Sequence, residues 1–111
     1  MSASPNEAPV LNLLASMTAD SLAASSLDAQ TLMLVRLAAL AAVDAPAGSY
    51  LMNLEAAAEV GLEGEHVRGV LAAIAPIVGT ARVVSAIGKI VDALAVELES
   101  EIAELDSQRE Q

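Results

Sequence analysis

The chain has 111 residues, a size typical of one domain, and its 55% hydrophobic residues include one aromatic side chain, Tyr50. Five Lys and Arg stand against fifteen Asp and Glu, and the net charge of −10 disfavours nucleic acids and anionic membrane surfaces as partners. The absence of Cys excludes disulfides, thiolate catalysis and Cys-ligated metals, and we expect no cofactor. Because Tyr50 is the one aromatic residue, the core is expected to be aliphatic.

Residues 1–9 contain two Pro among small polar residues and show no apolar periodicity, so we expect residues 1–8 to form a flexible tail. This start also lacks the basic stretch of a secretory signal. The longest uncharged apolar run, residues 69–81, is too short to span a bilayer. We therefore expect a soluble, cytoplasmic protein with no membrane partner.

Two helices are predicted before the first Pro-Gly break. Apolar residues at helical spacing from Val10 to Met17 indicate a short packing helix that ends before the polar region 18–26. The second helix, residues 27–45, has Ser26 or Asp28 as its N-cap and apolar or small residues on nearly every face. Such a helix lies at the centre of the fold, or a neighbouring subunit covers its remaining side.

A third helix is predicted from Tyr50 to Val60, after the break at residues 45–48. Ser49 is placed to cap its N-terminus. Gly61 stands where a helix end needs a left-handed residue, and Leu62 suits the apolar contact of a Schellman motif.

The fourth helix begins near Glu63 and Glu65, whose carboxylates oppose the positive end of the helix dipole. Its predicted buried stripe consists of Val67, Val70, Leu71, Ile74 and Ile77 or Val78. Pro76 removes one backbone hydrogen bond, so we expect a kink or register shift near Ala72. Gly79 is expected to end this helix, and Thr80 is expected to cap the N-terminus of the next one.

The last helix is predicted over residues 81–105, with apolar residues at a spacing close to seven and one slip at Glu101. This seam consists of Val84, Ile87, Val91, Leu94, Leu98, Ile102 and Leu105. Residues 92–111 hold seven carboxylates against the lone Arg109. They indicate a solubilising extension or an oligomer seam, or alternatively an acidic lure for a basic partner.

No segment alternates like a strand and none repeats, so the fold class is all-α, a compact bundle of about five helices. The expected organisation is a flexible tail (1–8), a helical domain (9–96) and an acidic C-terminal helix extension (97–111).

Two pieces of the chain, AAAEVGLEGEHV (56–67) and IVGTARVVSA (77–86), are similar to packing motifs of the carboxymuconolactone decarboxylase / alkylhydroperoxidase D-like family. The resemblance extends over residues 27–94. It implies an alkylhydroperoxidase D-like bundle that assembles into homotrimers, often paired into hexamers, with pockets at subunit interfaces.

The family's redox members carry Cys-x-x-Cys and a downstream His, and these places fall on Pro46, Ser49 and Asn53. The acid of the preceding helix falls near Met33 or Leu34, which are both apolar. None of these side chains replaces a thiolate or a proton relay, so thiol peroxidase activity is not expected. The decarboxylase members' His also corresponds to Asn53.

Arg36 is the only cation in an otherwise apolar helix, so it needs a partner if that helix is central. Glu55 or Glu59 on the next helix, or a neighbouring subunit, can supply one. Alternatively, Arg36 is the anion-binding group of a pocket and holds a substrate carboxylate.

Ser49, Tyr50 and Asn53 lie in the first turn of the third helix, where backbone N–H groups could hold a small anion. Together with Arg36 and Glu55 they form the predicted pocket. In the alternative interpretation Ser49 only caps the helix, and Tyr50 fills a gap with its hydroxyl at the surface.

Glu63 and His66 have the Glu-x-x-His spacing of carboxylate-bridged di-iron proteins, which makes them a weak metal-site candidate. Glu59 or another subunit's Glu97 would have to add ligands. Otherwise His66 is a solvated side chain.

The residues therefore predict a homo-oligomer that serves as a scaffold or small-ligand binder, with itself and a small organic acid as partners. The alternative is a cofactor-free lyase, decarboxylase or isomerase acting on a small organic acid at a subunit interface. In that case Arg36 orients the carboxylate, and Tyr50 or His66 donates protons. A di-metal oxidase is the third hypothesis.

Overall fold

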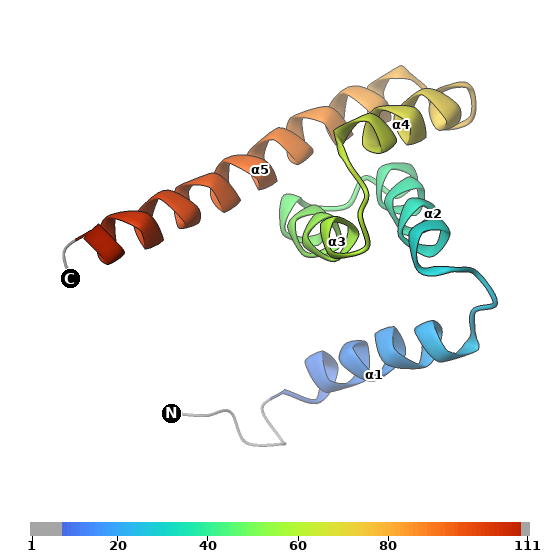
Figure 1. Cartoon of the computed structure of the whole chain (residues 1–111). Helices are drawn as coiled ribbons and strands as arrows, with labels where there is room; N and C mark the ends of the chain where they lie inside the picture. Colours follow the sequence, from blue (N-terminus) through green and yellow to red (C-terminus); the bar gives the residue numbers. More distant parts are fainter. Residues whose placement is uncertain (1–7, 110–111) are drawn as a thin grey trace.

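The computed structural model describes residues 8–109, and this part of the chain is all-α, with five helices and no strand (Figure 1). In chain order the helices are α1 (Pro9–Ala24), α2 (Ala29–Ala42), α3 (Ala47–Glu59), α4 (Gly64–Val78) and α5 (Thr80–Arg109). The predicted tail lies outside the described residues except for Ala8. None of the five helices combines the length and the apolar character needed to cross a membrane.

Helices α2 to α5 pack around one small core, and α1 packs against none of them (Figure 1). The buried cluster consists of Leu37, Ala41, Ala45, Tyr50, Leu71, Ala86, Ile90 and Ala93. Half of these are Ala, whose small side chains allow helix axes to approach closely. The sequence predicts a core of Leu, Val, Ile, Met and Ala; the buried cluster contains Leu, Ile and Ala, and Tyr50 is its largest fully buried side chain.

Helix α1 is longer than predicted, because it continues past Met17 to Ala24. The Thr18 hydroxyl donates a hydrogen bond to the Leu14 carbonyl at 3.0 Å, so Thr18 is accommodated inside the helix. No α1 residue is buried, and the prediction that it packs within the chain is wrong.

Helix α2 contacts α3, α4 and α5, which agrees with the first of the two alternatives that its all-round apolar pattern left open, a central position. It begins after Asp28, whose carboxylate accepts the Thr31 N–H at 2.8 Å, so the N-cap is Asp28 rather than Ser26. The helix ends before Asp44, which adopts a left-handed conformation with φ of 56°. This end comes three residues before the predicted one at Ala45.

Helix α3 begins earlier than predicted, with Pro46 as N-cap residue, so Ser49 lies inside the first turn and does not cap it. The predicted C-terminus is confirmed. Gly61 has φ of 87° and its N–H bonds the Ala58 carbonyl, while the Leu62 N–H bonds the Ala57 carbonyl at 3.0 Å. These two bonds are the Schellman motif.

Helices α4 and α5 form a tight antiparallel hairpin (Figure 1). Helix α4 continues through Pro76 and buries Leu71, but Ile77 is 86% exposed and does not belong to the stripe. Gly79, with φ of 89°, ends α4, and Thr80 is already the first residue of α5 rather than a cap before it.

Helix α5 packs through a different face from the predicted seam. Ala86, Ile90 and Ala93 are its buried residues, whereas the seven seam residues are between 48% and 61% exposed. The small Ala side chains suit close contact with α3, the neighbour that α5 contacts most. The seam residues Ile87, Val91 and Leu94 border a cavity, whereas Leu98, Ile102 and Leu105 have no partner among the described residues.

Candidate functional site

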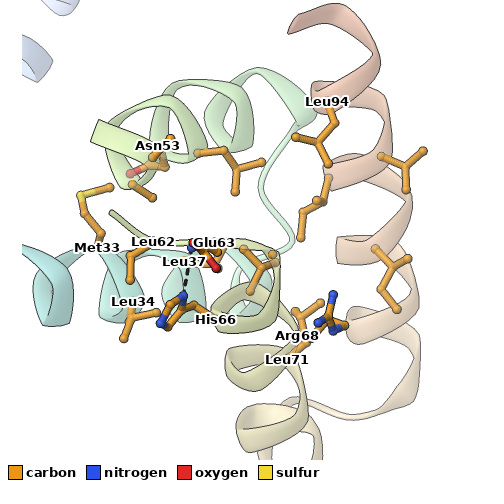
Figure 2. A pocket seen from close by; sticks show the side chains of 18 of the residues that line it. Met33, Leu34, Leu37, Asn53, Leu62, Glu63, His66, Arg68, Leu71 and Leu94 are labelled. Atoms are coloured by element: carbon orange, nitrogen blue, oxygen red, sulfur yellow. Dashed lines mark hydrogen bonds between the residues drawn. The ribbon is translucent and has the colours of Figure 1, made fainter. Parts of the chain in front are cut away.

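A cavity of about 360 Å³ lies among α2, α3, α4 and α5 (Figure 2). Each helix contributes aliphatic side chains to its wall, such as Met33 from α2, Leu54 from α3, Val67 from α4 and Leu94 from α5. The volume and the apolar wall are typical of small-molecule sites. It is the site that the geometry favours in residues 8–109.

Five polar side chains interrupt the apolar wall: Asn53, Glu63, His66, Arg68 and Glu97. The Asn53 amide nitrogen donates to the Ser49 carbonyl at 2.8 Å, and this bond leaves the amide oxygen as an acceptor. Arg68 forms no ion pair with any described residue and is the one cation on the cavity wall.

Glu63 and His66 form a capping box at the start of α4. The Glu63 N–H donates to His66 Nδ1 at 2.9 Å, and the Glu63 side chain accepts from the His66 backbone N–H (Figure 2). A ring nitrogen that accepts a hydrogen bond carries no proton, so the His66 proton is on Nε2. No three His, Asp or Glu side chains in the described range lie close enough to hold a metal ion. The pair is therefore observed as a cap, and the metal-site hypothesis gains no further ligand.

Arg36 forms no ion pair with Glu55 or Glu59 in the described part of the chain, so the pairing within one chain is wrong, and pairing with a neighbouring subunit stays a prediction. Its guanidinium instead donates to the Ser21 hydroxyl at 3.1 Å. Ser21 belongs to α1, and this is the one side-chain hydrogen bond between α1 and α2 among the described residues. Arg36 does not line the cavity.

Of the predicted pocket residues Arg36, Ser49, Tyr50, Asn53 and Glu55, the structure places Asn53 alone on the cavity wall. Tyr50 points into the core and is 0% exposed, which contradicts a surface hydroxyl. Glu55 lies on the exposed side of α3. Ser49, Tyr50, Asn53 and Glu55 all lie on α3, but their spacing did not indicate which side of α3 faces the cavity.

Sequence reasoning missed Arg68 and the apolar wall as site residues. The available signal was the position of Arg68 directly after Val67 of the predicted stripe, at the border of an apolar face. The position of Arg68 indicates a site only when the pairing of α4 with α5 is known, because Ile87 and Leu94 of α5 form the opposite wall of the cavity.

A second polar cluster lies outside the cavity wall, where the α2–α3 loop meets α5. Asp44 Oδ1 accepts from Ser85 Oγ at 2.6 Å and from Lys89 Nζ at 2.8 Å. The bond from Lys89, followed by that from Ser85, lowers the pKa of Asp44. The cluster secures the left-handed residue that ends α2.

Comparison of the chain with protein-family models, with curated proteins and with solved structures found no match. The resemblance to the carboxymuconolactone decarboxylase family therefore stays a prediction from the quoted motifs.

Proposed function

We propose that the chain is a homo-oligomeric, carboxymuconolactone decarboxylase-like helical protein that binds a small apolar molecule and performs no thiol peroxidase chemistry. The observation that carries the proposal is the cavity of about 360 Å³ among α2 to α5. Its wall is mainly aliphatic, so transfer of an apolar ligand from water into it is favourable.

The polar groups on the wall favour a ligand with one hydrogen-bond acceptor. Arg68 and the Nε2–H of His66 are donors, whereas Glu63 and Glu97 would repel a ligand with several negative charges. A small apolar molecule with a carbonyl or a single carboxylate has the matching chemistry.

Self-association is supported by the apolar surface that the single chain leaves open. Large aliphatic residues of α1 and α5 are exposed along both helices. Extensive exposed apolar surface on a folded chain is typical of a protein–protein interface.

The alternative, a cofactor-free lyase acting on a small organic acid, assigned roles to Arg36, Tyr50 and His66. The cavity wall includes only His66 of these three. The binder therefore has the stronger geometric support.

The binding site is tested by filling the cavity. Ala58 lies on the cavity wall and is exposed, so Ala58→Trp introduces an indole into the cavity without disturbing the buried cluster. We expect saturable binding of the apolar anion 8-anilinonaphthalene-1-sulfonate by the wild type, measured by calorimetry, and at least about tenfold weaker binding by Ala58→Trp.

The matched control is Ala72→Trp, an exposed Ala of α4 that does not line the cavity. Its affinity for the dye should equal that of the wild type. Equal losses in both variants, or dye binding without saturation, would place the dye on the exposed apolar surface and contradict the proposal.

A further inference from the structure

Two apolar helix faces have no partner in the single chain. On α1, Val10, Leu13, Leu14 and Met17 are between 51% and 65% exposed, and α1 packs against no other helix. On α5, the far part of the seam, which we call the distal seam, consists of Leu98, Ile102 and Leu105. Both faces have helical spacing, so each can accept another helix.

The charges around the distal seam oppose pairing of two α5 helices. If Leu98 and Leu105 occupy position a of a heptad, Glu97 and Glu104 fall at position g and Glu101 at position d. A second α5 would bring the same carboxylates against these, and like charges at such positions are destabilising.

Helix α1 lacks this conflict, because Asp20 is its one charged residue. Its 16 residues correspond to about 24 Å of helix, enough to cover the roughly 20 Å of α5 from Glu97 to Arg109. Within one chain the two helices do not touch, and Figure 1 shows them as separate arms. The hydrogen bond from Arg36 of α2 to Ser21 of α1 and the Asp28 N-cap of α2 lie at the connection between α1 and the packed helices α2 to α5.

We propose that α1 of one copy packs along the distal seam of α5 of a second copy. This inference rests on the self-association in the proposed function and names the surfaces that carry it. The distal seam continues the face of α5 on which Val91 and Leu94 line the cavity. The partner's α1 is therefore placed beside the cavity, and the assembly helps to shield the site from water.

The chain contains no Cys, so introduced thiols report contacts without background. Two single variants, Met17→Cys in the middle of α1 and Glu101→Cys beside the distal seam, are mixed, equilibrated and treated with a short bismaleimide. We expect the covalent dimer of one variant with the other to be the main product, identified by its mass. Each variant alone should give at least fivefold less dimer.

The matched control is Ser107→Cys, which lies on the same exposed stretch of α5 but on the side opposite Leu98 and Leu105. Mixed with Met17→Cys, it should give at least fivefold less dimer than Glu101→Cys. Circular dichroism confirms that every variant keeps its helix content.

Several results would overturn the inference. Efficient dimer formation by Glu101→Cys alone would show that α5 pairs with α5. A double variant Met17→Cys/Glu101→Cys that is linked within one chain would place α1 on its own α5. An oligomer by light scattering without the mixed product would exclude these surfaces while leaving the proposed self-association intact. A wild type that is monomeric at all concentrations would exclude both the α1–α5 contact and the proposed self-association. The dye titration would still test ligand binding in that case.

Discussion

Tyr50 is the residue with the least favourable local environment. Its hydroxyl lies in the buried cluster, and no described residue forms a hydrogen bond with it. A buried hydroxyl without a partner costs about 1–3 kcal/mol relative to water. The aromatic ring nevertheless belongs to the same buried cluster as Ala86 and Ala93 of α5, so the ring stabilises the core and the hydroxyl destabilises it.

Replacing Tyr50 with Phe separates these two effects. Because Phe keeps the ring and removes only the hydroxyl, we expect the free energy of unfolding at pH 7 to rise by about 1 kcal/mol, measured by urea denaturation. A decrease in stability would mean that the hydroxyl has a partner in solution and would contradict this account.

The pH dependence gives a second readout of the same substitution. Burial raises the pKa of Tyr50 above its usual value of 10.0, and the charge of Asp44 adds to the shift. A raised pKa in the folded state contributes stability below pH 10 that is lost as the pH rises further. The wild type should therefore lose stability above pH 10 faster than Tyr50→Phe.

At the scale of helices, the ends were predictable where one residue type is required by the backbone. Gly61 has φ of 87°, and the Schellman bonds form around it as the Gly-Leu pair predicted. The end of α1 was not predictable from its polar residues, because the hydroxyl of Thr18 found an acceptor within the helix. Residue types therefore predicted the end of α3 correctly and the end of α1 wrongly.

The packing faces were harder to predict than the helix boundaries. Periodicity identified the seam on α5 correctly as an apolar face, but the chain buries Ala86, Ile90 and Ala93 instead. Small residues give little signal in a hydrophobicity pattern, although they are what lets two helices approach closely. For the same reason the cavity, which depends on which faces meet, could not be located from the sequence, although three candidate residues, Asn53, Glu63 and His66, lie on its wall.

Two glycines test the role of the backbone at a helix end. Gly61→Ala should lower the free energy of unfolding by about 1–2 kcal/mol, because Ala is strained at positive φ. An added Cβ would also meet the Gln30 side chain at 3.3 Å. The control is Gly69→Ala inside α4, where nothing lies within 4 Å of the added carbon. There we expect a gain of about 0.5–1 kcal/mol, since Ala favours the helix.

Thermal and urea unfolding measure both variants under the same conditions. Opposite signs support the assignment of Gly61 to a conformational role. If both variants were stabilised, Gly61 would have to adopt negative φ in solution, and the Schellman end of α3 would be wrong.

In the proposed self-association, apolar contact and charge repulsion between copies oppose each other. The open faces of α1 and α5 favour contact between copies, whereas each copy carries a net charge of −10. The structure shows two ion pairs among residues 8–109, Lys89 with Asp44 and Arg109 with Asp106, and both are internal. Arg36, Arg68 and Arg82 form no ion pair among these residues, but carboxylates outnumber cations by fifteen to five, so the net electrostatic effect between two copies is repulsion.

Salt should therefore strengthen the proposed assembly. Raising NaCl from about 0.02 M to about 0.5 M shortens the screening length from roughly 20 Å to roughly 4 Å, which removes most repulsion between copies and leaves apolar contact in place. We expect the dissociation constant from analytical ultracentrifugation to fall several-fold. Glu104→Gln, beside the distal seam, should show a smaller salt effect than Glu59→Gln on α3, because only Glu104 lies where a second copy is proposed to pack. Dissociation at high salt would instead show that opposite charges hold the copies together, and the apolar faces of α1 and α5 would then need another explanation.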